Sequence, residues 1–97
     1  MRRYFVNPWT GTRWTILYVP EIVEEGTECD GLCNYETKEL FVCTGQDRFH
    51  EALTLIHEAW HTKSRSKNVG HIIRNRRLDN VIEDILKIQI ALGMIKL

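Results

Sequence analysis

ALTLIHEAWH, residues 52–61, is the stretch that decides the fold, and it contains an H-E-x-x-H motif at residues 57–61. In a helix, His57 and His61 lie one above the other on one face, because they are four residues apart. Two imidazoles placed in this way can bind a single Zn²⁺ at about 2.0–2.1 Å. Glu58 is turned about 100° from His57, where its carboxylate could hold a metal-bound water instead of the metal. The motif therefore predicts a zinc site with a carboxylate beside it.

The residues around the motif have the periodicity of an amphipathic helix. One arc of the helical wheel carries its apolar residues, namely Phe49, Ala52, Leu53, Ile56 and Trp60. The two histidines fall at the edge of this arc, so the helix can bury its apolar stripe while the pair faces a cleft. Thr44 and Asp47 resemble a capping box and predict the helix start. The alternative is an amphipathic helix whose histidines merely fall at the core boundary.

The length and composition predict one small domain spanning residues 1–97. The chain is 43% hydrophobic and 27% charged, as in ordinary soluble globular proteins. No apolar run has the length of a membrane span, and MRRYFVNPW lacks the apolar core of a signal peptide. Three cysteines, an odd number, argue against a complete disulfide framework. We therefore expect a reduced, cytoplasmic protein without a membrane partner.

The net charge of zero hides an asymmetry between the two parts of the chain. Residues 1–62 carry a net charge of −5, and residues 63–97 carry +5. Most of the excess lies in the basic segment, residues 63–77. Such a cluster could contact the phosphates of a nucleic acid, although a solvated loop beside an acidic half-domain is the commoner explanation.

The chain before the motif reads as two hairpins. Residues 4–6 and 13–19 are rich in aromatic and β-branched residues, and turn-forming residues separate them. Residues 31–35 and 40–43 form the second predicted hairpin. Residues 20–26, PEIVEEG, predict either a turn of helix or a charged loop.

The chain after the motif reads as a loop followed by a helix. Residues 62–76 are loop-like, with a turn near Gly70. A final helix is predicted over residues 78–92, and Gly93 is its stop signal. The fold class is therefore α+β, with a small antiparallel sheet of three to four strands packed on the H-E-x-x-H helix and a C-terminal helix.

Two stretches resemble a known family. Residues 30–38 read DGLCNYETK, and an apolar strand and LTLIHEAWH follow. This is similar to the G-x-C/A-D-Y-x-T hairpin and L-I-H-E-x-x-H helix of the minigluzincins, small zinc metallopeptidases, and of short phage and bacterial proteins of that kind. Residues 84–93, DILKIQIALG, are similar to a D-I-A-x-x-L-x-x-L-G ending in some relatives. The resemblance covers residues 30–62 and 81–93.

The resemblance implies a third metal ligand on the final helix, where gluzincins supply a glutamate. Here two acids are adjacent, Glu83 and Asp84. On the helical wheel, Asp84 lies about 80° from the centre of the apolar stripe, whereas Glu83 lies nearly opposite that centre. We therefore favour Asp84, with Glu83 as the close alternative. Asp79 is also turned away from the stripe.

Two further histidines have open roles. His71 is either a surface loop residue, a third ligand as in SprT-like proteins, or a donor to a developing oxyanion. His50 shares the face of the ligand pair but lies about 10.5 Å along the axis. It therefore lines the cleft or is solvated, and does not share the zinc.

The cysteines offer a competing metal site, and the aromatic residues fill the predicted core. Cys29, Cys33 and Cys43 lack the paired spacing of a structural zinc site and fit small buried residues better. The residues expected in the core are Trp9, Trp14, Trp60, Tyr18 and Phe41.

The leading functional prediction is zinc-dependent hydrolysis of peptide bonds in a peptide or protein substrate. His57, His61 and Asp84 would hold Zn²⁺ and leave one position for water, with Glu58 as the general base. The resemblance also implies that the strand at Leu40–Val42 pairs with an extended substrate. The alternative is a non-catalytic, zinc-stabilised binding module, which could contact nucleic acid through residues 63–77. The oligomeric state cannot be read from the sequence.

Overall fold

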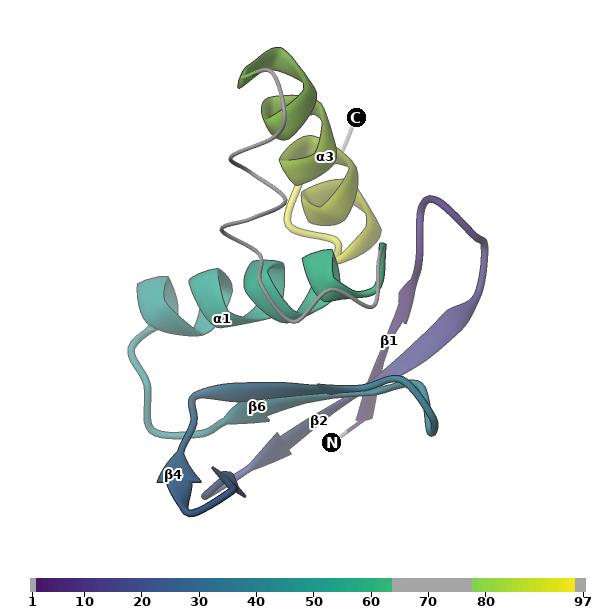
Figure 1. Cartoon of the computed structure of the whole chain (residues 1–97). Coiled ribbons are helices and arrows are strands. Elements are labelled where there is room, and N and C mark those ends of the chain that lie inside the picture. Colours follow the sequence, from purple (N-terminus) through teal and green to yellow (C-terminus); the bar gives the residue numbers. More distant parts are fainter. Residues whose placement is uncertain (1, 64–77, 96–97) are drawn as a thin grey trace.

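The computed structural model describes residues 2–63 and 78–95 and has an α+β fold, as the sequence predicts. A four-stranded sheet forms one layer, and helix α1 (Arg48–His61) lies across it. Helix α3 (Leu78–Ala91) packs against α1 on the side away from the sheet (Figure 1). Helix α1 is thus the middle layer, so its two sides meet different surroundings.

Both predicted hairpins are present in the sheet, whose order is β1-β2-β6-β5. The first hairpin joins β1 (Arg2–Val6) to β2 (Arg13–Val19), and the second joins β5 (Gly31–Asn34) to β6 (Glu39–Cys43). One detail of the prediction is wrong, because β2 and β6 pair in parallel and the sheet is mixed. The reason is the strand order. Strand β6, not β5, lies next to β2, and this central place buries Leu40 and Val42 completely.

Residues 20–26 do not form the predicted turn of helix or loop. Strands β3 (Val23–Glu24) and β4 (Thr27–Glu28) form a separate two-stranded ribbon between β2 and β5. Its two-residue turn has positive φ at Glu25 (52°) and Gly26 (79°), the combination of a type I′ hairpin turn. Glutamate is an unusual residue at such a φ, so the sequence carried a weak hairpin signal.

The ends of both helices have identifiable caps. The carboxylate of Asp47 accepts the backbone N–H of His50 at 2.9 Å, so Asp47 is the N-cap of α1 and the predicted start at Thr44 is wrong. After α3, Gly93 takes φ +76°, and the N–H groups of Gly93 and Met94 bond the carbonyls of Ile90 and Gln89. This is a Schellman motif, and it confirms Gly93 as the stop. The loop predicted over 62–76 lies almost wholly outside the described residues.

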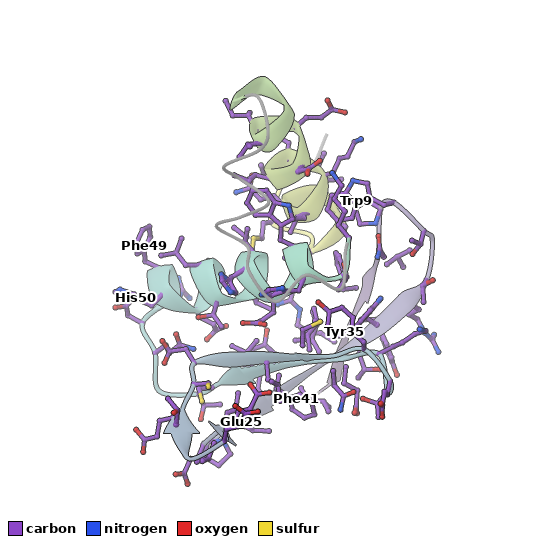
Figure 2. The ribbon with its side chains drawn as sticks, viewed as in Figure 1. Trp9, Glu25, Tyr35, Phe41, Phe49 and His50 are labelled. Atoms are coloured by element: carbon purple, nitrogen blue, oxygen red, sulfur yellow. The ribbon has the colours of Figure 1, made fainter. Side chains whose placement is uncertain are left out.

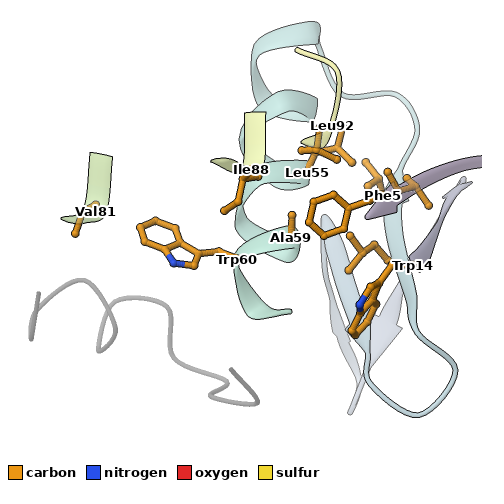
Figure 3. Close-up of a cluster of buried hydrophobic side chains, with 11 residues drawn as sticks. Phe5, Trp14, Leu55, Ala59, Trp60, Val81, Ile88 and Leu92 are labelled. Carbon is orange, nitrogen blue, oxygen red and sulfur yellow. The ribbon is translucent and has the colours of Figure 1, made fainter. Parts of the chain in front are cut away.

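The core joins the inner face of the sheet to both helices (Figure 3). Phe5 and Trp14 come from the sheet, and Leu55, Ala59 and Trp60 come from α1. Of the aromatic residues expected there, Trp14 and Trp60 are buried, whereas Trp9 and Tyr18 pack against the core from its edge. Phe41 is half-buried on the opposite face of the sheet, because it alternates with the inward Leu40 and Val42.

None of the described helices is both long enough and apolar enough to cross a membrane.

Candidate metal centre

The C-terminal half of α1 brings the three motif side chains together. The Nε2 atoms of His57 and His61 lie 3.2 Å apart, and their rings meet edge to face. The metal-binding atoms of His57, Glu58 and His61 all lie within 4.8 Å of one another. The structure therefore brings together the three residues that the motif singles out.

The spacing of the two imidazoles fits a shared zinc ion. Two nitrogens that each lie about 2.0–2.1 Å from a tetrahedral zinc are about 3.3 Å apart. Burial, and secondarily the charge of His61, lower the pKa of His57. Both effects favour the neutral imidazole, which is the form that binds a metal. The pair also satisfies the geometry of a hydrogen bond, in which one ring donates to the other.

The motif faces a cavity of about 570 Å³ between α1 and strand β5. Among the described residues, ten line it: Glu24, Gly31, Leu32, Cys33, Asn34, Tyr35, Glu36, His57, Glu58 and His61. Strand β5 supplies one wall and the histidine face of α1 supplies the other. The cavity therefore places the metal-binding group beside the edge strand of the sheet.

Gly31 permits the close approach of α1 to β5. A Cβ at this position would lie 2.6 Å from Thr54 Cγ2 and 2.9 Å from both Cγ and Oε2 of Glu58. Both distances are shorter than real Cβ contacts, so any side chain would push the helix or the Glu58 carboxylate away. The glycine thus leaves the space in which Glu58 lies against the strand.

Glu58 is buried, and its carboxylate has no partner among the described residues. The residue is only 8% exposed, and no described group forms a hydrogen bond or ion pair with its carboxylate. Burial first, and the nearby charge of Glu24 second, raise the pKa of Glu58 to about 7. A carboxyl group with such a pKa can take up and release a proton near neutral pH.

Hydrogen bonds to two carbonyls hold the C-terminal end of α1. The hydroxyl of Tyr35, which follows β5, donates to the carbonyl of His61 at 3.0 Å (Figure 2). The buried amide of Asn7 donates to the carbonyl of Thr62 at 3.0 Å. These carbonyls lie at the end of the helix, where no further turn can satisfy them. The two contacts fix the helix end that carries His61 relative to both hairpins.

Of the two acids proposed on the final helix, Asp84 faces α1 and Glu83 faces solvent. Asp84 is only 3% exposed, whereas Glu83 is exposed and forms an ion pair with Lys87. The Oδ2 atom of Asp84 lies 2.7 Å from the Nζ of Lys63. Within the described chain, the group of converging metal-binding atoms does not include Asp84 or Glu83. The orientation predicted from the helical wheel is correct, and the role of Asp84 as a ligand stays a prediction.

His50 does not line the cavity. Its Nδ1 lies 2.7 Å from Asp47 Oδ2, its ring packs against Phe49, and the side chain is exposed at the start of α1 (Figure 2). The solvated alternative is thus confirmed for His50. His71 and all of the basic segment except Lys63 lie outside the described residues.

The cysteines do not converge on a metal site in the described parts of the chain. All three are free, and none belongs to the group of converging ligand atoms. Cys33 lines the cavity, but burial, and secondarily the charge of Glu58, raise the pKa of its thiol to about 12. In the metal-free fold it is therefore a neutral thiol at ordinary pH.

The sequence reasoning missed four contributors to the site: Gly31, Tyr35, Glu24 and Lys63. Gly31 and Tyr35 lie in the DGLCNYETK stretch that carried the family resemblance, so a signal for them existed. Glu24 and Lys63 meet their partners across 34 and 21 residues of sequence respectively. No local pattern predicts such contacts.

Comparisons with known proteins found no matching family model, no matching curated protein and no matching solved structure.

Proposed function

We propose that this protein is a zinc-dependent peptidase of the minigluzincin kind. One observation carries the proposal: Glu58, a buried residue whose carboxylate has no partner among the described residues, shares a cavity with two imidazole nitrogens 3.2 Å apart. A pair of histidines that only stabilised the fold would not require this carboxylate. A carboxyl group with a perturbed pKa beside a cavity is a candidate for a chemical role.

His57 and His61 would hold the zinc ion through their Nε2 atoms, and Asp84 is the proposed third ligand. A bound zinc supplies Lewis acidity, which lowers the pKa of a water molecule and polarises a carbonyl oxygen. Glu58 accepts the proton of the attacking water and returns it to the leaving amine.

An extended substrate would bind along β5 and not along the strand at Leu40–Val42. That strand is part of β6, which pairs with β2 on one side and β5 on the other. Its backbone groups are therefore already used in the sheet. Strands β1 and β5 are the two edges of the four-stranded sheet, and of these two only β5 lines the cavity in the part of the chain that the structure describes. A peptide added to this edge would pass the histidine pair.

The metal requirement is tested by zinc analysis of purified variants. We expect about one zinc per wild-type chain and near-complete loss in His57→Ala and in His61→Ala. His50→Ala is the matched control, because this exposed histidine lies on the same helix outside the cavity, and it should keep the zinc. Unchanged zinc content in both ligand variants would contradict the site.

Catalysis is tested with Glu58→Gln, which keeps the side-chain shape and removes the base. We expect the variant to retain zinc and a similar melting temperature. Turnover of a diverse peptide or unfolded-protein library should fall by at least about 10²–10⁴-fold, the usual contribution of a general base. Equal cleavage by wild type and variant would contradict the role of Glu58. A zinc-loaded wild type without turnover would favour a zinc-stabilised binding module.

A further inference from the structure

The cavity that holds the histidine pair has a negatively charged lining. Glu24, Glu36 and Glu58 contribute carboxylates, and no lysine or arginine is among the described lining residues. No described group pairs with any of the three carboxylates. Fields from like charges add in a cavity with low-dielectric walls and attract ligands of opposite charge.

The two exposed carboxylates lie toward opposite ends of β5. Glu24 belongs to the ribbon β3–β4, which leads into β5 at Gly31, and its charge acts on Glu58. Glu36 follows Tyr35 in the turn after β5. The C-terminal end of β5 lies near His61, because the hydroxyl of Tyr35 donates to the carbonyl of His61. The N-terminal end of β5 lies near Glu58, because Gly31 lies against the Glu58 side chain. A peptide extended along β5 would therefore meet one acid on each side of the histidine pair.

We propose that the cavity selects cationic peptides, with a lysine or arginine on either side of the bond that lies at His57 and His61. This inference rests on the proposed function, since it assigns the substrate class of the same site. Two separate observations support it: the exposed carboxylates of Glu24 and Glu36 in the lining, and Glu58, a residue only 8% exposed that lines the cavity without a partner among the described residues. The carboxylates of the lining would select a positively charged side chain of the peptide. The free edge of β5 would pair with the backbone of the peptide, whatever its other side chains are.

Binding without turnover tests the inference separately from catalysis. Zinc-loaded Glu58→Gln is titrated, by fluorescence anisotropy, with capped peptides that carry either lysine or its neutral isostere norleucine at one position. We expect the lysine peptides to bind roughly three- to tenfold more tightly at low salt, and this advantage to shrink as ionic strength rises. Equal affinity of the two series would overturn the inference.

Three rim variants show whether the two carboxylates cause the preference. In zinc-loaded Glu58→Gln, adding Glu24→Gln or Glu36→Gln should each reduce the ratio of the affinities for lysine and norleucine peptides. The two variants should act on lysines at opposite sides of the scissile bond. Glu25→Gln is the matched control, because Glu25 neighbours Glu24 on the ribbon but does not line the cavity, and it should change nothing. Equal behaviour of Glu24→Gln and Glu25→Gln would overturn the role of Glu24.

Cleavage of the same peptides by the zinc-loaded wild type separates the two proposals. Cleavage of lysine and norleucine peptides at equal rates would refute the charge preference and leave the peptidase intact. Selective binding of lysine peptides without cleavage would support the cationic site and contradict the peptidase. Neither binding nor cleavage of any peptide would contradict both.

Discussion

Helix α1 lies between two regions that each hold a buried carboxylate, and the two carboxylates are treated differently. On the β5 side, Glu58 faces a cavity and has no partner in the described parts of the chain, and its pKa is raised to about 7. On the α3 side, Asp84 is more deeply buried, and Lys63 compensates its charge at 2.7 Å. Similar burial thus gives an ion pair on one side and an unpaired acid on the other.

This difference separates what stabilises the fold from what can react. A paired buried acid keeps its charge, and removing its partner would be costly. An unpaired acid beside a cavity can exchange a proton with a ligand. In the zinc-free protein the α3 side therefore fixes the end of α1, and the β5 side carries the proposed general base; the proposed ligation by Asp84 requires that zinc replace Lys63 as the partner of its carboxylate. The predictions below test this division.

The largest expected effect concerns the pH dependence of the zinc-free protein. Because the pKa of Glu58 is about 7 in the fold and near 4.5 ordinarily, the folded protein holds a proton that the unfolded chain releases between these values. Stability should therefore fall as the pH rises from about 4.5 to about 7, by an amount on the order of 3 kcal/mol. Urea unfolding at a series of pH values measures it.

The control for this prediction is Glu58→Gln, which lacks the titrating group. The lowered pKa of His57 acts in the opposite direction, but it is present in both proteins and cancels in the difference. The difference between wild type and variant should therefore grow from pH 4.5 to pH 7 and then stay constant. Parallel pH profiles would show that Glu58 has an ordinary pKa.

A smaller effect is expected from breaking the ion pair on the other side of α1. Asp84→Ala and Lys63→Met should each lower the free energy of unfolding of the zinc-free protein by about 1–3 kcal/mol, because each removes one partner of a charged, partly buried hydrogen bond. If Asp84 is also the third ligand, Asp84→Ala alone should weaken zinc affinity, by at least about tenfold. Chelator competition measures it.

Glu83→Ala is the matched control for Asp84→Ala, because Glu83 is the neighbouring acid and forms only an exposed pair with Lys87. It should leave stability and zinc affinity nearly unchanged. Release of zinc by Glu83→Ala alone would contradict the choice of Asp84. Equal zinc affinity in all three variants would give Asp84 a purely structural role.

The sequence predicted the elements of this fold better than their arrangement. The H-E-x-x-H helix and both hairpins follow from local periodicity, and Gly93 marks the end of α3. The parallel pairing of β2 and β6 depends on which strand lies next to β2, which no local pattern records. The ribbon was missed because Glu25 takes a positive φ without the usual Asn-Gly or Asp-Gly signal.

The candidate site divides in the same way. The motif predicted that His57, Glu58 and His61 would share a site, since they lie within one and a half turns of one helix. The helical wheel also placed Asp84 toward α1 and Glu83 toward solvent. It could not show that Lys63 pairs with Asp84, or that the ribbon brings Glu24 close to Glu58. Both contacts join residues far apart in the chain, so only the fold reveals them.

The most direct test of the central claim is a crystal structure of the zinc-loaded protein with anomalous diffraction data at the zinc edge. We predict one strong anomalous peak between the Nε2 atoms of His57 and His61, about 2.0–2.1 Å from each, with Glu58 beside it in the cavity. The peak should be absent in His57→Ala. A peak at the cysteines, or no peak at the histidine pair, would contradict the account.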